Sequence, residues 1–360
     1  MIEIAQVNAS LDEAGDENAC LIVGKRVAKR VLRCKDSEIK SIELHRKSID
    51  ARKKRDVHFI LSFRVELTSP HLEREAVDSV TERDRSRVRA IEDDEPSFPS
   101  PVSDAPLERP VVIGAGCAGL FAALTLAEAG LKPLLIERGD PAFRRSQAID
   151  LFLKERILDP ESNIQCGLGG AGTFSDGKLT TRVGDPLCAF VTGAFLDHGA
   201  PADIAWRQKP HVGTDLLRDV IRSIRGEIES LGGEVRFNTA LTGLQIRNGA
   251  LTGIDTTAGS VACEQLILAV GHSARDTFAM LHELGLPLAC KPFSVGFRAE
   301  HLQTEIDKSL YHGAAGHPAL PKGEYQLSQH VGGGRCVYTF CMCPGGTVCA
   351  AASEEGGVVT

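Results

Sequence analysis

The sequence predicts a mixed α/β protein with a parallel sheet at its centre and a smaller α/β module before it. The first observation is a continuous apolar segment at residues 111–113, of the kind found in buried strands of parallel sheets. A glycine-rich turn, an apolar helix and a second apolar strand follow it directly. The third observation is the order strand, helix, strand, strand over residues 1–70. A chain of 360 residues is long enough for two or three such domains.

Composition limits the class of protein. Hydrophobic residues make up 42% of the chain and charged residues 25%, as in ordinary globular proteins, and the net charge of −7 gives no general affinity for nucleic acids. No apolar run approaches the roughly 18 residues that cross a bilayer, and the acidic N-terminus does not resemble a secretory signal. We therefore expect a cytoplasmic protein without a membrane partner. The eleven scattered cysteines contain no CxxC pair, which indicates reduced thiols and no metal site.

The N-terminal module is expected to have strands at 2–8, 41–50 and 57–67, with a helix at 20–34 between the first two. The last strand is the clearest, because apolar residues alternate with more polar ones. These are Phe59, Leu61, Phe63, Val65 and Leu67. The pattern predicts a small α/β sandwich with one face of its sheet open.

The segment 20–55 of this module is locally basic. Its Lys and Arg residues are Lys25, Arg26, Lys29, Arg30, Arg33, Lys35, Arg52, Lys53, Lys54 and Arg55. One interpretation is an anionic partner such as RNA, which would make the protein an RNA-associated flavoprotein or binding module. The other is a solvated helix face and hairpin tip, which is favoured because no aromatic platform accompanies the charge.

The glycine-rich turn after the strand at 111–113 reads Gly114-Ala-Gly116-Cys-Ala-Gly119. In such a turn Gly114 permits the tight bend, Gly116 lets the main chain approach a pyrophosphate, and Gly119 lets the helix pack close to the strand. The helix that follows, at 118–129, points its N-terminal N–H groups and the positive end of its dipole at the phosphates.

A strand at 134–136 then delivers Glu137, about 20 residues beyond the turn, where a dinucleotide site places its acid. A carboxylate there accepts hydrogen bonds from both ribose hydroxyls and repels a 2′-phosphate, which favours FAD or NAD over NADP. The neighbouring Arg138 is included among the cofactor-binding candidates.

The spacing of the later elements favours a flavin. The third parallel strand, at 234–237, comes only after a long insertion and a helix at 215–231. Short strands with turns follow it, and a buried strand at 266–271 ends in Gly271. This order resembles the FAD domains of glutathione-reductase-like flavoproteins, which implies that Gly271 lies near the cofactor.

Several segments resemble the signatures of a bacterial family of FAD-dependent dehydrogenases, uncharacterised NAD(P)/FAD-dependent oxidoreductases with a small N-terminal domain. They are SNIQCGLGGAGTFSDGKLTTR, PHVGTD, LAVGHSARDTF, KPFSVGFRAEH and YTFCMCPGG. The resemblance covers nearly the whole chain and implies FAD as cofactor, with NADH or NADPH as a possible electron donor and an unidentified small-molecule substrate.

The second glycine-rich segment, 167–172, does not follow a strand or open a helix. We expect instead a loop that brings main-chain N–H groups against the pyrophosphate or the flavin ring, with Gly170, Gly172 and Ser175 as candidates. Lys178 either places positive charge near the flavin or is a surface lysine. Only Cys166 lies in this loop, so disulfide reductase activity is not expected.

His272 follows the strand that ends in Gly271, and it is a candidate acid or base or a side chain that bonds a local carbonyl. Ser273 and Asp276 fit a capping box for a helix ending at Gly285. Cys341 and Cys343 share a face if their segment is a strand, and packing is the favoured role for them.

The predicted organisation is an N-terminal module (1–70), a linker (71–108), an FAD-binding domain in two parts (109–185 and 211–285), a cap insertion (186–210) and a substrate domain (286–360). Members of the resembling family continue beyond residue 360, so we expect a C-terminally truncated chain. One alternative is accordingly a truncated remnant in which FAD binding is impaired.

Overall fold

The computed structural model describes residues 1–92, 101–103, 108–174, 177–179, 181, 183 and 185–359. These residues fall into two compact units, which we describe separately. The first contains the described residues within Met1–Glu95, Ala202–Pro210 and Ala299–Thr347, and the second those within Pro96–Pro201, His211–Arg298 and Val348–Thr360.

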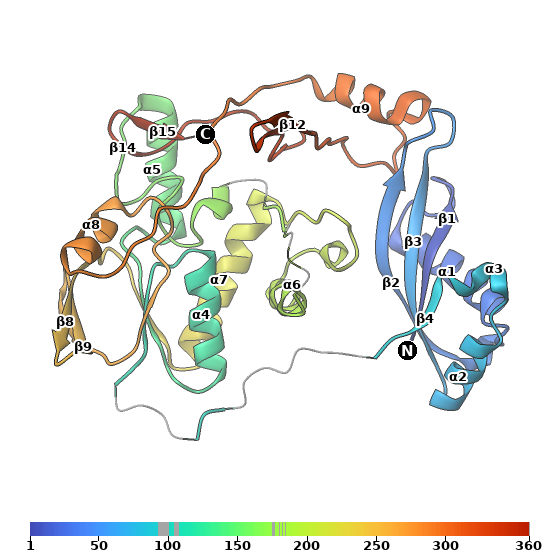
Figure 1. The fold of residues 1–360 in the computed structure, drawn as a ribbon, viewed down its shortest axis with the longest axis horizontal. Helices are drawn as coiled ribbons and strands as arrows, with labels where there is room; N and C mark the ends of the chain where they lie inside the picture. The colour runs from blue at the N-terminus through green and yellow to red at the C-terminus, as the bar shows by residue number, and fades with distance from the viewer. Residues whose placement is uncertain are drawn as a thin grey trace. The chain divides into compact units, whose positions relative to one another are not determined.

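An antiparallel sheet with the strand order β2-β3-β1-β4 organises the first unit (Figure 1). Its strands are β1 (Ile2–Ala9), β2 (Ile39–Asp50), β3 (His58–Leu67) and β4 (Val88–Ala90). The alternation expected in β3 is confirmed, because Phe59, Leu61 and Phe63 are at most 1% exposed. Residues such as His58 and Arg64, which alternate with them, are only partly buried. One face of the sheet therefore carries the core.

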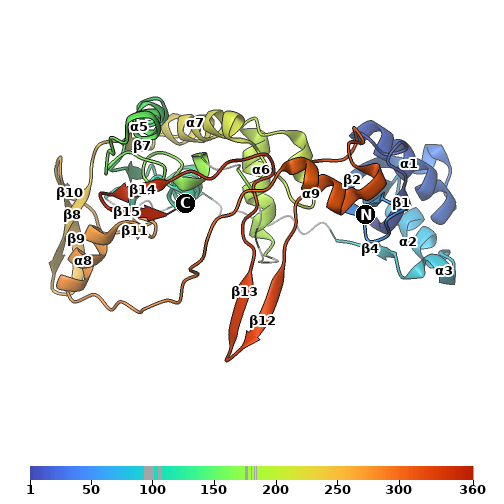
Figure 2. The same cartoon turned by 90° about the horizontal axis from the view of Figure 1, so that it is seen from above.

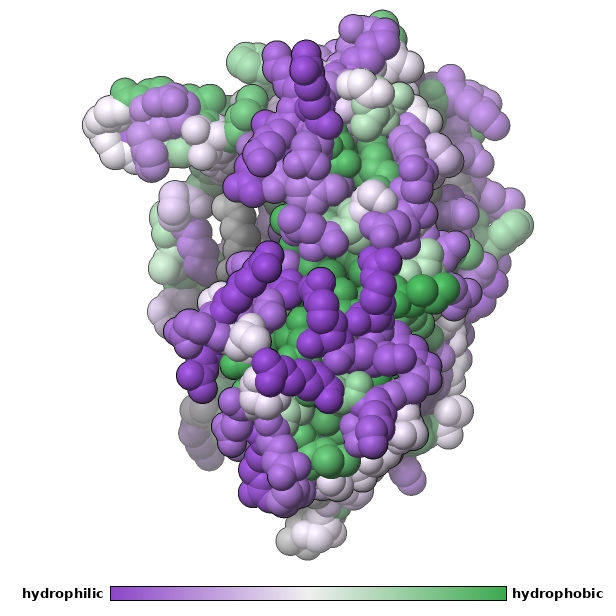
Figure 3. All heavy atoms as spheres, turned by 90° about the vertical axis from the view of Figure 1, so that its right-hand side faces the viewer, coloured by the Kyte–Doolittle hydropathy of each residue, from purple (hydrophilic) through white to green (hydrophobic). Residues whose placement is uncertain are grey.

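Three helices, α1 (Glu17–Val31), α2 (Pro70–Asp78) and α3 (Glu82–Arg85), lie on the same side of this sheet (Figure 1). Helix α1 begins where the Asp16 carboxylate accepts a hydrogen bond of 2.8 Å from the Ala19 N–H. Figure 3 views the molecule from this side and shows mainly hydrophilic residues (purple) with apolar areas (green) between them. This surface is typical of amphipathic helices that bury one face.

The structure differs from the predicted linker at residues 70–90, which form α2, α3 and β4. The Ser69 hydroxyl accepts a 3.3 Å hydrogen bond from Leu72 N–H at the start of α2, and Ala76 and Val80 enter the core. Strand β4 extends the sheet by pairing with β1, with Val88 opposite Ile4. The sequence of residues 70–90 contains many charged residues, so its few buried apolar positions did not indicate helices or a strand. The Pro- and Ser-rich part at 93–100 lies outside the described residues.

Helix α1 contacts β3 closely at Gly24, where an added Cβ would lie 2.6 Å from a ring carbon of the fully buried Phe63. We expect Gly24→Ala to lower the free energy of unfolding by about 1–2 kcal/mol, because overpacking outweighs the gain in helix propensity. Urea unfolding measures this. Gly226→Ala, in a helix position with no heavy atom within 4 Å, is the matched control and should be neutral or stabilising. Equal free energies of unfolding for the Gly24 and Gly226 variants would contradict the close approach of Gly24 to Phe63.

The second unit is built on a parallel sheet with the strand order β11-β5-β6-β7. Its strands are β5 (Val111–Ile113), β6 (Leu134–Ile136), β7 (Glu234–Arg236) and β11 (Leu266–Leu268). The register places Ile113 beside Ile136 and Leu268. The four strands lie where the sequence predicted them, but β11 is shorter than the buried strand expected at 266–271, and its Ile267 and Leu268 are 40% and 38% exposed. The α/β class with a parallel sheet is confirmed.

Helices α4 (Cys117–Glu128) and α7 (Thr214–Ser230) lie side by side in this unit (Figure 1). The apolar stripe predicted for α7 is buried, since Val220, Ile224 and Ile228 are at most 1% exposed. The other helices of the unit are α5 (Ala142–Glu155), α6 (Leu187–Asp197) and α8 (Arg275–Glu283). The expected run of short strands is an antiparallel meander of β8 (Leu241–Arg247), β9 (Ala250–Thr256) and β10 (Gly259–Ala262).

The segment 286–359 is divided between the units. Helix α9 (Gln303–Tyr311) and the hairpin of β12 (Ser328–Gly332) and β13 (Arg335–Tyr338) belong to the first, and β14 (Ala351–Glu354) and β15 (Gly357–Val359) to the second. Figure 2 shows the β12–β13 hairpin as a projecting ribbon, and all its residues are exposed. Residues 293–300, in which apolar residues alternate with others as they do in a strand, are irregular backbone.

Candidate functional site

The turn after β5 has the geometry that its glycines predict. Gly114 adopts a φ of +97°, and its N–H donates a 2.7 Å hydrogen bond to the Ile136 carbonyl of the neighbouring strand. A Cβ at this position would lie 2.5 Å from the Ala269 carbonyl oxygen. The main chain therefore bends here between two other segments, in a space that admits only glycine.

Gly119 and Gly116 differ in what surrounds them. A Cβ on Gly119 would lie 1.7 Å from the Gly114 carbonyl oxygen, so α4 packs directly on the turn. A Cβ on Gly116 would meet only Gly170 Cα, at 3.9 Å. Gly116 is the N-cap of α4 and no described side chain caps it, which leaves first-turn N–H groups available to an anion.

Glu137 lies at the end of β6 and is only 4% exposed. Its two carboxylate oxygens accept hydrogen bonds from Ala115 N–H, at 2.7 Å, and Gly139 N–H, at 2.8 Å. Glu137 thus ties the second strand to the glycine turn. Each oxygen retains a second lone pair that can accept a ribose hydroxyl.

Arg138 is held between two carboxylates. It donates to Glu161 at 2.5 and 2.9 Å and to Asp276 at 3.0 Å twice. Four of its five N–H groups are therefore engaged, and these bonds, foremost those to Glu161, raise the pKa of Arg138 above its ordinary value. The arrangement fixes the position of α8, and it leaves little of the guanidinium for a cofactor.

The capping box expected at Ser273 and Asp276 is wrong. The N-cap of α8 is Ala274 and has no side-chain cap, because the Asp276 carboxylate pairs with Arg138. The Ser273 hydroxyl instead donates to the Gln165 side-chain oxygen. Both polar groups are used for contacts between segments that are distant in the sequence.

The hydrogen bonds from Arg138 hold the pKa of Asp276 below its ordinary value. A carboxylate with a depressed pKa stabilises the fold above its unfolded pKa, and this contribution is lost as the pH falls through the folded pKa. We expect Asp276→Asn to cost about 0.5 kcal/mol at about pH 7, as is usual for exposed pairs, and less at about pH 3, where part of this stabilisation is lost. Urea unfolding at both pH values measures the difference. Asp150→Asn, which removes an exposed charge from α5, is the control.

The second glycine-rich segment lies directly beside the first. Gly169 N–H donates a 2.7 Å hydrogen bond to the Ala115 carbonyl, and a Cβ on Gly170 would lie 3.1 Å from Gly116 Cα. Gly172 follows in a short 3₁₀ turn, Ala171–Phe174. Ser175 lies outside the described residues. Two main-chain segments without side chains therefore face each other at Gly116 and Gly170.

Arg145 organises this second segment, and the sequence reasoning missed it. The side chain is completely buried in α5, and its guanidinium donates to four main-chain carbonyls of residues 163–170. A signal was present, because Ala142, Arg145 and Ile149 have the spacing of one buried helix face. An arginine at a core position indicates a polar cluster in the interior.

His272 and Gly271 follow β11, as predicted. Gly271 has a φ of +72°, and His272 Nδ1 lies 2.8 Å from the Ser273 hydroxyl. Through Ser273 and Gln165 these residues are linked to the Ala351 carbonyl of β14, which accepts from the Gln165 amide. The loop after β11, the glycine-rich segment and β14 therefore form one hydrogen-bonded network.

The remaining candidates are less defined. Lys178 forms an isolated antiparallel bridge with His211 and is partly buried. Cys341 is half-buried and Cys343 exposed, and no group of three potential metal ligands occurs among the described residues. No described helix is long and apolar enough to cross a membrane.

The basic segment of the first unit is partly ion-paired. Lys25 and Lys29 lie 3.0 and 3.5 Å from Asp36, and Arg26 lies 3.0 Å from Glu13. These pairs neutralise part of the positive charge on α1, which favours the interpretation of a solvated helix face.

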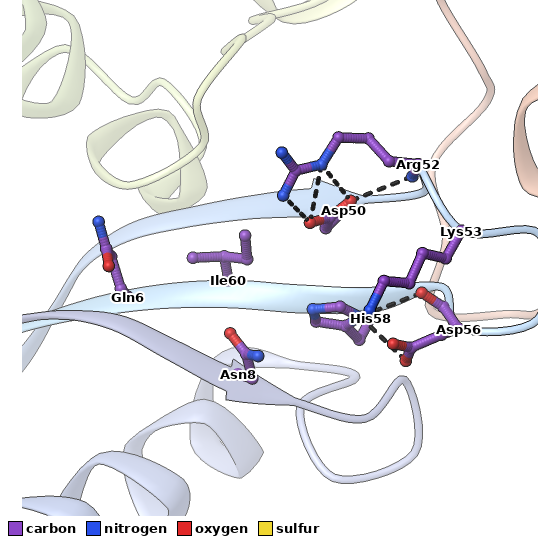
Figure 4. A pocket seen from close by; sticks show the side chains of 8 residues that line it. All are labelled: Gln6, Asn8, Asp50, Arg52, Lys53, Asp56, His58 and Ile60. Carbon is purple, nitrogen blue, oxygen red and sulfur yellow. Dashed lines mark hydrogen bonds and ion pairs between the residues drawn. The ribbon is translucent and has the colours of Figure 1, made fainter.

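Two hollows lie away from the glycine turn. The larger, of about 930 Å³, is on the polar side of the first unit's sheet (Figure 4). It is lined by Gln6, Asn8, Asp50, Arg52, Lys53, Asp56, His58 and Ile60. Arg52 forms an ion pair with Asp50, and His58 Nδ1 lies 3.2 Å from an Asp56 carboxylate oxygen, so these polar groups contact one another within the hollow. The smaller, of about 180 Å³, lies between α4, α6 and α7 at Glu128, His198 and Glu227. Neither contains a candidate cofactor residue.

The residues at the turn fit the adenosine and pyrophosphate portions of FAD. Bare main chain at Gly116 and Gly170 provides close approach, the uncapped start of α4 provides N–H donors, and the buried Glu137 provides a hydroxyl acceptor. A Cβ at Gly116 or Gly170 would protrude into this region. The chemistry of the donors is therefore that of a dinucleotide site.

Three family descriptions match the chain. Residues 108–280 match pyridine nucleotide-disulphide oxidoreductases, residues 292–360 match the C-terminal domain-like part of FAD-dependent proteins, and residues 1–66 match a domain of unknown function. Among solved structures, glycine oxidase from Bacillus cereus is 15% identical, with a TM-score of 0.33 over 50% of this chain and 58% of that one.

Two curated relatives match the chain over part of their own length. An uncharacterized protein of Clostridium beijerinckii is 42% identical over 362 residues, which cover all of this chain and 65% of the relative. Digeranylgeranylglycerophospholipid reductase of Methanosarcina acetivorans is 28% identical over 181 residues, or 44% of each protein. The chain thus spans less than two thirds of the length of either relative. Over residues 108–280 and 292–360 the chain is therefore similar to pyridine nucleotide-disulphide oxidoreductases and to FAD-dependent proteins.

Proposed function

We propose that the chain binds FAD with the pyrophosphate against Gly114–Gly119 and the adenosine ribose at Glu137, and that the whole protein oxidises or reduces a small molecule through this flavin. The observation that carries the proposal is the open main chain at Gly116, beside the uncapped start of α4. The buried Glu137 carboxylate at the end of the neighbouring strand supports it.

The residues of the chain would bind, orient and shield the cofactor. First-turn N–H groups of α4 donate to the pyrophosphate, and the helix dipole adds to the attraction. FAD, when bound, supplies hydride-transfer chemistry at its flavin ring. His272, whose Nδ1 is engaged by Ser273, keeps Nε2 as the atom that can hold or release a proton near the cofactor.

A titration of the purified chain with FAD tests the proposal. We expect stoichiometric binding, measured by quenching of flavin fluorescence and by a shifted visible absorption spectrum. Addition of NADH or NADPH under anaerobic conditions then reports the electron donor through bleaching of that spectrum. ADP should compete with FAD, because the proposed contacts are to the adenosine and pyrophosphate. An unchanged flavin signal at high protein concentration would contradict the proposal.

A further inference from the structure

Arg145 is a fully buried cation whose contacts are all with main-chain carbonyls or rings among the described residues. Its Nε donates to Asn163 O at 2.9 Å, its Nη1 to Leu168 O at 2.6 Å, and its Nη2 to Ile164 O and Gly170 O at 3.0 and 2.8 Å. Among the described residues no carboxylate oxygen lies within ion-pair distance of it, although the Glu137 carboxylate acts on its charge electrostatically. Burial lowers the pKa of Arg145 to about 10, so the group stays cationic at neutral pH.

The loop is shaped around this side chain. Gly167 adopts a φ of +111°, and a Cβ there would lie 2.5 Å from Arg145 Cδ. The Phe174 ring lies 4.7 Å from the guanidinium carbon and covers it. Without Arg145 all four carbonyls would lose a hydrogen bond, and among the described residues only Leu168 O and Gly170 O would keep one of 3.3 Å each, from Thr173. A buried polar group left unpaired costs more than the bond contributed. The conformation of residues 163–170 therefore depends on Arg145.

The other side of the same loop meets the dinucleotide turn. Gly169 N–H bonds the Ala115 carbonyl at 2.7 Å, and Gly170, whose carbonyl Arg145 binds, approaches Gly116. A short series of contacts thus runs from the guanidinium through Gly170 to the point where a pyrophosphate would approach. A well-packed apolar side chain often stabilises a fold as well as a buried ion does, so a buried charge at this place calls for a functional reason.

We propose that Arg145 is the positioning residue of the cofactor site: it holds the 163–170 loop beside Gly116, so that loop and turn form two main-chain walls around the FAD pyrophosphate. This inference rests on the proposed function of the turn. The buried positive charge also favours the anionic pyrophosphate, because it is screened less by solvent than a surface charge is.

The test compares Arg145→Met with Arg144→Met in the full chain. Arg144 is the adjacent residue on α5 and is exposed, so its variant removes the same charge without touching the loop. We expect the dissociation constant of FAD to rise at least about 100-fold for Arg145→Met and to stay within about twofold of the wild type for Arg144→Met.

A second measurement separates positioning from general structural damage. ADP and AMP share the adenosine and differ in the second phosphate, so the ratio of their dissociation constants reports the pyrophosphate contacts alone. In the wild type ADP should bind more tightly than AMP. In Arg145 variants the preference should fall towards about one, whereas a merely structural role would weaken both ligands equally.

Two further variants decide the matter if Arg145→Met does not fold. Arg145→Lys keeps the charge but cannot donate to four carbonyls, so its preference for ADP should be intermediate. Gly170→Ala leaves Arg145 in place and pushes a methyl group against Gly116 Cα, which should weaken FAD at least about tenfold. Gly285→Ala is its control, since Gly285 has a similar φ of +78° and no heavy atom within 4 Å of an added Cβ.

The outcomes are distinguishable. If the wild type binds neither FAD nor ADP, the proposed function fails and this inference fails with it. If the wild type binds both and the folded Arg145 and Gly170 variants bind FAD with unchanged affinity and an unchanged preference for ADP, the FAD site stands and the positioning role of Arg145 is overturned.

Discussion

Gly119→Ala should destabilise the second unit by about 3 kcal/mol or more and abolish FAD binding. The added Cβ would lie 1.7 Å from the Gly114 carbonyl oxygen, far inside any tolerated contact. The atom it meets is main chain held in a tight turn, so no side-chain rotation relieves the clash. Helix α4 would have to move away from the sheet, and the cost should reach or exceed the upper end of the range for overpacked sites.

Urea unfolding, followed by circular dichroism, measures the change in the free energy of unfolding for Gly119→Ala. The control is Gly193→Ala in α6, where an added Cβ meets no heavy atom within 4 Å and helix propensity improves. That variant should be at least as stable as the wild type. If Gly119→Ala unfolded within about 0.5 kcal/mol of the wild type, the close packing of α4 on the turn would be refuted.

The sequence predicted those parts of the second unit that depend on local pattern. The strand at Val111–Ile113, the three glycines and Glu137 follow one another within 27 residues. The reason for each residue type can be recognised from the neighbouring sequence alone. Gly119, for example, must be a glycine because a Cβ there would collide with the Gly114 carbonyl oxygen of the same turn. The fold of this region and the position of Glu137 at the end of β6 therefore follow from the amino-acid pattern alone.

Contacts between distant segments could not be predicted in this way. Asp276 stands where a helix cap is expected, yet its carboxylate accepts a hydrogen bond from Arg138, which lies just after β6. Arg145 reads as one more charge on a helix, and only the folding of residues 163–170 around it shows its role. The segment at 293–300 has the apolar alternation of a strand but is irregular backbone, because hydrogen bonding to a neighbouring strand and not periodicity makes a strand.

Gly116 and Gly119 belong to one motif, but the structure predicts different effects when each is replaced by alanine. A methyl group on Gly119 collides with the fold itself. On Gly116 it finds room, since the nearest heavy atom is Gly170 Cα at 3.9 Å and the backbone, with a φ of −72°, is open to any residue. Substitutions at Gly119 and Gly116 can therefore separate an effect on folding from an effect on cofactor binding.

We accordingly expect Gly116→Ala to keep the stability of the wild type while its dissociation constant for FAD rises about 100-fold, or about 2.7 kcal/mol. The methyl group would stand where the pyrophosphate must approach the main chain, and it would displace the phosphate from the N–H groups of α4. Fluorescence titration with FAD and urea unfolding of the same preparation provide the two values. Because Gly116→Ala leaves the turn intact, undiminished affinity would mean that the pyrophosphate does not bind at Gly116, whereas a matching loss of stability would mean that Gly116, like Gly119, serves packing.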